Sequence, residues 1–188
     1  MAANITAFDL AAELDQRAFR THEHVYLDVI EAAYGADAHP RDFHIDRIRR
    51  QQHLILFHHA EDERVTGVAS VRPDGKLCAL GVAPDSRSRG HARGLVLFAA
   101  AQRRHLYCEV KFTNVQMRAF ASHVGFEYLR DESRILSLLG ADAALVSGWI
   151  RTHDCLSYER ASRSFAGRPS QLVMLELRQQ PQVGGLQM

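Results

Sequence analysis

The chain has 188 residues, of which 46% are hydrophobic and 24% charged, and its formal net charge is +1. This length and composition suit one globular domain over residues 1–188 and exclude a disordered, collagen-like or coiled-coil protein. The balance of 23 Lys plus Arg against 22 Asp plus Glu argues against binding to nucleic acid or to a membrane surface through bulk charge.

The three cysteines show no CxxC spacing, so neither a disulfide framework nor a metal site is expected. Residues 1–20 lack the basic segment and apolar run of a signal peptide. No window approaches the ~18 apolar residues that a membrane-spanning helix needs. We therefore expect a reduced, cytoplasmic protein.

The first part of the chain, residues 1–52, is expected to be helical. Apolar residues at helical spacing predict two helices within residues 8–34, separated near Thr21 and His22. A polar, helix-compatible stretch follows at residues 41–51.

Residues 53–130 alternate between strand and helix patterns. Three apolar runs joined by tight turns predict an antiparallel meander with strands at 54–57, 65–71 and 77–82. The elements expected after it are a helix at 90–104, a strand at 106–112, a helix at 114–124 and a strand at 126–129. This β-β-β-α-β-α-β order is typical of an α/β (α+β) domain with a central sheet.

The last part of the chain has a weaker pattern. We interpret residues 134–170 as a helical and loop insertion, with a helix at 142–150. A final strand is expected at 171–178 and a polar tail at 179–188.

The loop after the third strand carries the most informative residues, Arg87-Ser88-Arg89-Gly90-His91-Ala92-Arg93. It leads into a helix, whose N-terminus exposes unpaired N–H groups and the positive end of the helix dipole, a site suited to phosphate. Gly90 and Ala92 remove bulk where a ligand would meet the backbone, and the three arginines add charged donors. The alternative is an ordinary solvated, arginine-rich helix start.

Residues 87–92 resemble the Arg/Gln-x-x-Gly-x-Gly/Ala signature of the GNAT superfamily of N-acetyltransferases. The preceding Leu80-Gly81-Val82-Ala83-Pro84 resembles the strand that enters that loop, and Asn114 with Gly125-Phe126 resembles the family's second motif. The likeness covers residues 53–130. It implies a mixed, mostly antiparallel central sheet with a splayed pair of strands, flanked by helices.

The resemblance implies an acyl-CoA-dependent N-acyltransferase, most simply an acetyltransferase, that acts on an amine of a small molecule or a protein by direct attack. Residues 87–93, including Ser88, His91 and Arg93, would hold the coenzyme A pyrophosphate. Leu80, Gly81 and Val82 would line the pantetheine, with a backbone N–H near Val82 polarising the thioester carbonyl. Asn114 would lie near the pantetheine, and no metal is expected.

Glu109 is the candidate base. Cys108-Glu109-Val110 is similar to the Leu-Glu-Val segment of GNAT enzymes that acetylate protein N-termini, in which that glutamate takes the proton. The alternative is a glutamate that only faces solvent.

The acid is where the chain departs from the family. Many members carry a tyrosine four residues before the glycine of the Gly-Phe pair, and here that position is Ala121. Three interpretations stay open: the thiolate leaves unaided, another group replaces the phenol, or the protein is a regulatory module that binds acyl-CoA without transfer. The candidates for a replacement group are Ser122, His123, Cys108 and Tyr128, of which Tyr128 could reach in from the next strand. Residues 134–170 would either shape the acceptor pocket or make a homodimer interface.

Overall fold

The structure is a computed structural model that describes residues 4–35, 38, 40–103, 105–111, 113–128, 150–153, 155–160 and 170–177. The chain divides into two compact units, Met1–Leu106 and Tyr107–Met188. No described helix has the length and apolar character needed to cross a bilayer.

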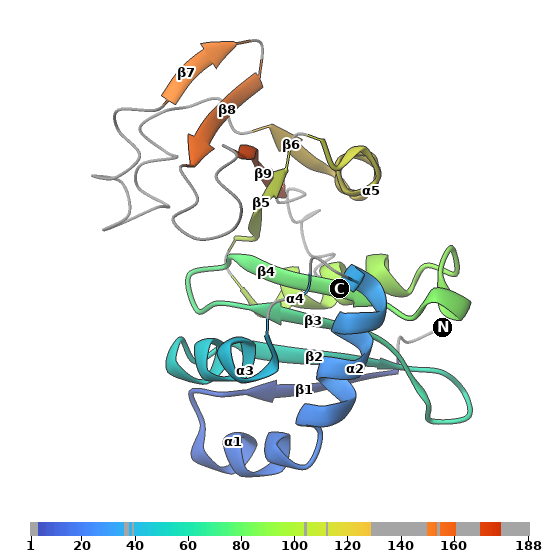
Figure 1. The fold of residues 1–188 in the computed structure, drawn as a ribbon. Coiled ribbons are helices and arrows are strands. Elements are labelled where there is room, and N and C mark those ends of the chain that lie inside the picture. The colour runs from blue at the N-terminus through green and yellow to red at the C-terminus, as the bar shows by residue number, and fades with distance from the viewer. Residues whose placement is uncertain are drawn as a thin grey trace, which may run out of the picture. The chain divides into compact units, whose positions relative to one another are not determined.

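The first unit contains a four-stranded antiparallel sheet in the order β1-β2-β3-β4 (Figure 1). Its elements in chain order are β1 (Ile5–Asp9), α1 (Glu13–Arg20), α2 (Glu23–Tyr34), α3 (Arg41–Arg50), β2 (Leu54–His59), β3 (Val65–Val71), β4 (Leu77–Val82), a 3-10 turn (Pro84–Ser86) and α4 (His91–Gln102).

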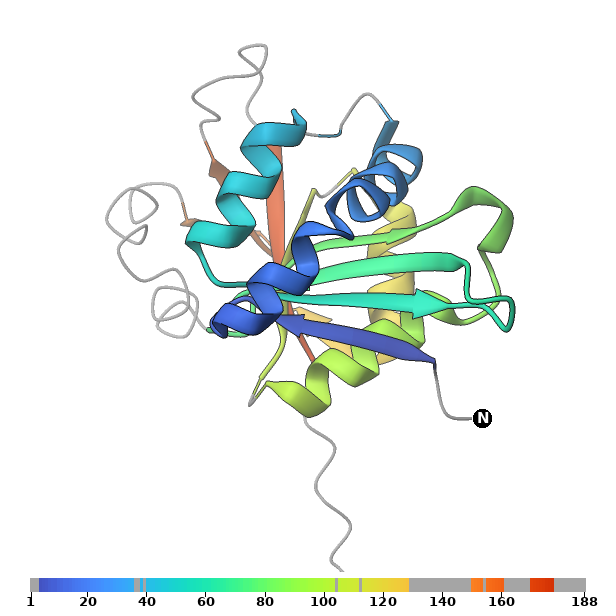
Figure 2. The same ribbon diagram turned by 90° about the horizontal axis from the view of Figure 1, so that it is seen from below.

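Helices cover both faces of this sheet (Figure 2). Gly81 of β4 pairs with Val68 of β3, and a Cβ on Gly81 would lie 3.2 Å from the Cβ of Ala33 on α2. A Cβ on Gly67, the neighbouring residue of β3, would instead lie 3.2 Å from Leu95 of α4. Because successive strand residues face opposite sides, α2 and α4 pack on opposite faces. The glycines therefore let both helices approach closely.

The main core of the first unit joins α1, α2 and α3 to the sheet. Phe19, Tyr26 and Phe57 are buried in it and contact one another through their rings. The Tyr26 hydroxyl lies 3.0 Å from Nε2 of His44 on α3. Burial raises the pKa of Tyr26, so its hydroxyl stays neutral and keeps this hydrogen bond.

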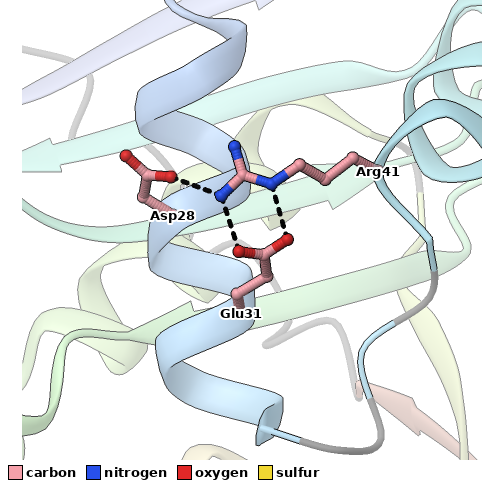
Figure 3. A network of polar contacts seen from close by, with 3 residues as sticks. All are labelled: Asp28, Glu31 and Arg41. Carbon is pink, nitrogen blue, oxygen red and sulfur yellow. Dashed lines mark hydrogen bonds and ion pairs between the residues drawn. The ribbon is translucent and has the colours of Figure 1, made fainter.

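An exposed ion-pair network holds the start of α3 against α2 (Figure 3). Nε and Nη2 of Arg41 donate to the two carboxylate oxygens of Glu31, at 2.7 and 2.6 Å, and Nη2 also donates to Asp28 at 2.7 Å. These hydrogen bonds raise the pKa of Arg41 and lower that of Glu31. The two-pronged geometry fixes orientation as well as charge.

The second unit has a five-stranded antiparallel sheet, in which β5, β9, β8 and β7 are neighbours in that order and β6 also pairs with β9. Its elements are β5 (Tyr107–Lys111), α5 (Val115–Val124), β6 (Phe126–Tyr128), β7 (Ile150–His153), β8 (Cys155–Arg160) and β9 (Ser170–Leu177).

The β-β-β-α-β-α-β order predicted for residues 53–130 is confirmed, and every strand pair is antiparallel. The expectation of an entirely helical start was wrong, because β1 precedes the helices. Only Phe8 of its five residues is buried, so this edge strand lacks the alternating apolar pattern that reveals a strand.

The expectation of helix and loop at residues 150–160 was also wrong, since β7 and β8 form a hairpin there. The strand propensity of residues 150–160 is weak, and β8 is stabilised by its pairing with β9. A pairing between distant residues leaves no pattern in the local sequence. The described residues do not include 134–149, which contain the rest of the helix expected at 142–150. They also do not include the tail at 179–188. The final strand is confirmed at 170–177. That residues 1–188 form one domain stays a prediction.

Candidate functional site

β4 is an edge strand of the first sheet, and its backbone alternates between β3 and the open side. The N–H of Ala83 donates to the carbonyl of Thr66 on the β3 side at 3.0 Å. Because hydrogen-bonded pairs recur at every second residue of an antiparallel ladder, Gly81 also bonds toward β3. The backbone groups of Leu80 and Val82 therefore face the open edge. This places the Val82 N–H where a ligand that pairs with the strand would meet it.

Tyr34, at the end of α2, reaches this open edge. Its hydroxyl donates to the Leu80 carbonyl at 3.3 Å and accepts from the Leu80 N–H at 3.2 Å. No sequence pattern pointed to Tyr34, because the contact depends on how α2 packs on β4. The Tyr34 side chain is 40% exposed and hydrogen-bonds both the N–H and the carbonyl of Leu80, two residues before Val82.

The loop between β4 and α4 has the backbone geometry of an anion site. Ser88 and Gly90 have φ values of +62° and +84°, and Gly90 is the N-cap of α4. A Cβ on Gly90 would meet no described atom within 4 Å, so the space beside it is open in this part of the structure. The first helical hydrogen bond runs from Gly94 to Gly90, which leaves the three preceding N–H groups of α4 without helical partners.

The charge of this loop is positive. Asp85 is its one carboxylate, and Arg64, outside the loop, donates to it at 2.5 Å. This hydrogen bond lowers the pKa of Asp85 and raises that of Arg64. Arg89 and Arg93 are exposed and make no ion pair with any residue that the structure describes. Their charges are therefore available to an anion.

Arg87 lies differently from the other two arginines. Its Nε is 3.4 Å from the Val82 carbonyl and its Nη2 is 3.5 Å from the Ala33 carbonyl, both long contacts. The side chain thus turns back along the open edge of β4. Its predicted contact with a pyrophosphate stays a prediction.

His91, the first residue of α4, contacts a second histidine. Its Nδ1 lies 3.2 Å from Nε2 of His58, and Nδ1 of His58 lies 2.8 Å from the Thr66 hydroxyl. That hydroxyl donates to the His58 carbonyl, so it accepts from His58 Nδ1. His58 Nε2 must then accept from His91 Nδ1, which leaves Nε2 of neutral His91 without a hydrogen.

Protonation would change what His91 offers a phosphate. Burial lowers the pKa of both His58 and His91, and the positive charge of Arg89 lowers that of His91 further. At neutral pH His91 therefore has no hydrogen at Nε2 to donate. Only its protonated form can bond a phosphate through that atom.

Two more predicted residues belong to the second unit. Glu109 is half-buried in the middle of β5, between the buried side chains of Cys108 and Val110, which face the other side of the strand. Asn114 is the N-cap of α5, and its side chain accepts the Met117 N–H at 3.0 Å. This capping bond gives Asn114 a structural role in addition to the predicted one.

The end of α5 keeps the expected scaffold. Ala121 is completely buried, Gly125 ends the helix with a φ of +103°, and Phe126 is buried. Tyr128 belongs to β6, but its side chain lies outside what the structure describes. Its role as a replacement acid stays a prediction.

The predicted residues fall into two groups. Those from Leu80 to Arg93 belong to the first unit, and Glu109, Asn114 and Tyr128 belong to the second. Among the residues described, no three His, Cys, Asp or Glu side chains gather to hold a metal ion.

Comparisons with solved structures show the fold. The Escherichia coli ribosomal-protein-S18-alanine N-acetyltransferase has a TM-score of 0.56 at 14% identity, covering 92% of each chain. Salmonella typhimurium yncA, solved with its cofactor acetyl-CoA, gives 0.52 at 14% identity, covering 97% of this chain and 98% of that one. A Bacillus subtilis acetyltransferase in complex with CoA gives 0.51 at 14% identity, covering 84% and 93%.

A search of curated proteins found no match. The family profile described as "Acetyltransferase (GNAT) family" matches residues 10–126. This match spans more than half of the chain and contains the loop after β4 and both sequence motifs. The chain therefore belongs to the GNAT acetyltransferase family.

Proposed function

We propose that the protein transfers an acyl group, most simply acetyl, from acyl-CoA to an amine. One observation carries the proposal: the open edge of β4 runs directly into a positively charged, open helix N-terminus. An acyl-CoA carries a pantetheine that can pair with a strand edge and a pyrophosphate that suits a helix N-terminus. Two solved relatives of the same fold hold acetyl-CoA or CoA, which supports this choice of donor.

In the proposed complex, the N–H groups at the start of α4 that lack helical partners donate to the pyrophosphate, and Arg89 and Arg93 balance its charge. The Val82 N–H donates to the carbonyl oxygen of the thioester. Such a donor stabilises the negative charge that develops on this oxygen during attack.

The amine nitrogen attacks the thioester carbonyl carbon, a C–N bond forms, and the C–S bond breaks with its electron pair passing to sulfur. Glu109, in the role that the family resemblance implies, takes the proton that the amine loses, directly or through water. A thiol pKa of about 8.5 makes the thiolate a good leaving group, so departure needs no strong acid. Tyr128 is the candidate donor if one takes part.

Replacing Glu109 with Gln should lower kcat about a hundredfold or more, because general base catalysis contributes roughly 10²–10⁴-fold. The Kd of acetyl-CoA should stay nearly unchanged. Thiol release gives kcat, and calorimetry gives Kd. The matched control is Glu127→Gln, an exposed carboxylate on β6, which should turn over like the wild type. Equal kcat for Glu109→Gln and the wild type would remove Glu109 from the mechanism.

Replacing His91 with Ala should leave the Kd of CoA within about twofold at pH 8, since neutral His91 has no hydrogen to donate at Nε2. A phosphate beside the ring favours its protonated form, so the advantage of the wild type over the variant should grow as the pH falls from 8 into the range where the ring takes up a proton. Calorimetry of both proteins at several pH values measures this ratio. A ratio that does not change with pH means that His91 does not contact a phosphate.

A second candidate function is acyl-CoA binding without transfer, and the alanine at position 121 favours it because no phenol is present there. This alternative expects acetyl-CoA to raise Tm while no amine is acylated. A single amine that is acylated with equimolar thiol release excludes it.

A further inference from the structure

A small pocket lies on the α2 and α3 side of the first sheet, apart from the loop after β4. Its volume is about 90 Å³, several times what one water molecule needs. The residues with polar side chains around it are Tyr34, His44, Arg47, His53, Ser70 and Cys78. The rest of the lining is aliphatic. The Arg41 network fixes two of the walls, since it holds α3 on α2 (Figure 3).

Two buried polar atoms of this lining lack a hydrogen-bond partner within the described ranges of the chain. His53 and Ser70 are both 0% exposed, and His53 Nδ1 and Ser70 Oγ have no partner with hydrogen-bond geometry among the described residues, although the Ser70 hydroxyl is close enough to that of Tyr26 to act on its pKa. The other ring nitrogen of His53 lies 3.0 Å from the Gln51 side-chain oxygen, so it donates there and Nδ1 is an acceptor. Unsatisfied buried polar atoms are costly, and two of them on one pocket indicate a polar occupant.

The pocket carries one uncompensated positive charge. Arg47 is half-buried and makes no ion pair within the described part of the chain, whereas Arg41 and Arg49 on the same helix each hold a carboxylate. No carboxylate of a described residue lines the pocket. Burial, together with the charge of Arg47, lowers the pKa of His53 to about 3. Burial raises the pKa of the Cys78 thiol, so neither group offsets the arginine at neutral pH.

A single guanidinium that has no carboxylate partner among the described residues matches a monoanion, and its planar donors match a carboxylate. The Ser70 hydroxyl can donate to the same carboxylate. The volume leaves room for a water molecule that donates to His53 Nδ1. These features together select a carboxylate as the occupant.

The pocket adjoins the strand on which the thioester is expected. Tyr34 lines the pocket and bonds the backbone of Leu80 at the open edge of β4. Ala79 of β4 also lines it, three residues before Val82. At about 3.3 Å per residue, the pocket wall lies roughly 10 Å along the strand from the Val82 N–H.

We propose that this pocket binds a carboxylate carried by the acceptor amine, with Arg47 and Ser70 as its donors. The inference rests on the proposed acyltransfer and narrows its acceptors to amines that carry a carboxylate several bonds from the nitrogen. Arg47 is then a specificity-determining residue.

The test compares acceptors that differ only in the carboxylate: 8-aminooctanoate against octylamine, and 6-aminohexanoate against hexylamine. A charge-assisted hydrogen bond is worth roughly 1.5–3 kcal/mol, so the wild type should prefer the carboxylate in at least one pair about tenfold or more in kcat/KM. Arg47→Gln should abolish that preference by lowering kcat/KM for the aminoalkanoate alone. Arg50→Gln, an exposed arginine on the same helix, should keep it. Equal use of both members of each pair by the wild type, or an equal loss for both in Arg47→Gln, overturns the proposal.

A binding measurement separates this proposal from the proposed function. Octanoate and hexanoate carry the carboxylate without an amine, and either should shift the ring signals of His53 in NMR spectra of histidine-labelled wild type but not of Arg47→Gln. If no amine is acetylated while an alkanoate binds in this way, the proposed acyl transfer is wrong. The pocket is then a carboxylate site that does not bind an acceptor amine. If neither alkanoate perturbs His53, the pocket proposal fails whatever the transfer assay shows.

Discussion

Replacing Arg89 with Glu should weaken the binding of acetyl-CoA about a hundredfold, which corresponds to about 3 kcal/mol. The loop after β4 has one carboxylate, Asp85, and Arg64 already pairs with it. Arg89 is exposed and makes no ion pair with a described residue, so no described carboxylate of the first unit neutralises its charge. A glutamate there replaces an attraction for the pyrophosphate with a repulsion beside the start of α4.

Calorimetry at moderate salt measures this change. The matched control is Arg50→Glu on α3, which makes the same change in net charge away from the loop and should bind acetyl-CoA like the wild type. Gly90→Ala tests the backbone geometry of the loop without changing its charge. Gly90 has a φ of +84°, which costs an L-residue about 1–2 kcal/mol, although a Cβ there would have open space. If Arg89→Glu binds as tightly as Arg50→Glu, the loop is not the pyrophosphate site.

Lowering the pH from 7 to 5 should reduce the free energy of unfolding by about 2 kcal/mol through His53 alone. The pKa of native His53 is about 3, mainly because the ring is buried. An unfolded histidine has a pKa of about 6.5, so between these values only the unfolded chain takes up the proton. The stability is fully present above about pH 6.5 and falls by about 1.4 kcal/mol per pH unit toward pH 3.

Urea unfolding followed by circular dichroism at both pH values measures this loss, in a range where most carboxylates stay ionised. His53→Gln removes the titrating ring, so the variant should lose about 2 kcal/mol less than the wild type over this range. His24→Gln, which changes an exposed histidine on α2, is the control and should lose as much as the wild type. Equal pH dependence in the wild type and His53→Gln would mean that His53 can be protonated without unfolding.

The fold of residues 53–130 could be predicted because its strands are short apolar runs between turns and its helices have a buried face. β1 could not, since an edge strand with one buried side chain leaves no periodic signal. The hairpin of β7 and β8 depends on pairing with β9, a contact between distant parts of the sequence.

The candidate site divides in the same way. Arg89, Gly90 and Arg93 lie within five residues of one another in the sequence, so a loop motif could identify them. Tyr34 could not be found, because its bond to Leu80 joins residues 46 positions apart. The pocket with Arg47 and His53 could not be predicted for the same reason. Its walls come from α2, α3 and two strands, and no local sequence pattern indicates that these residues meet.

The proposed activity is acyl transfer from acetyl-CoA to an amine. The most direct measurement incubates the protein with acetyl-CoA and a panel of amines, including the aminoalkanoates and N-terminal peptides, and quantifies free CoA thiol and N-acetylated product together. We expect at least one amine to be acetylated with equimolar thiol release, and Arg89→Glu to lose this activity at low acetyl-CoA. If acetyl-CoA raises Tm while no amine in the panel is acetylated, the protein is not an acetyltransferase for these amines and is a module that binds acyl-CoA.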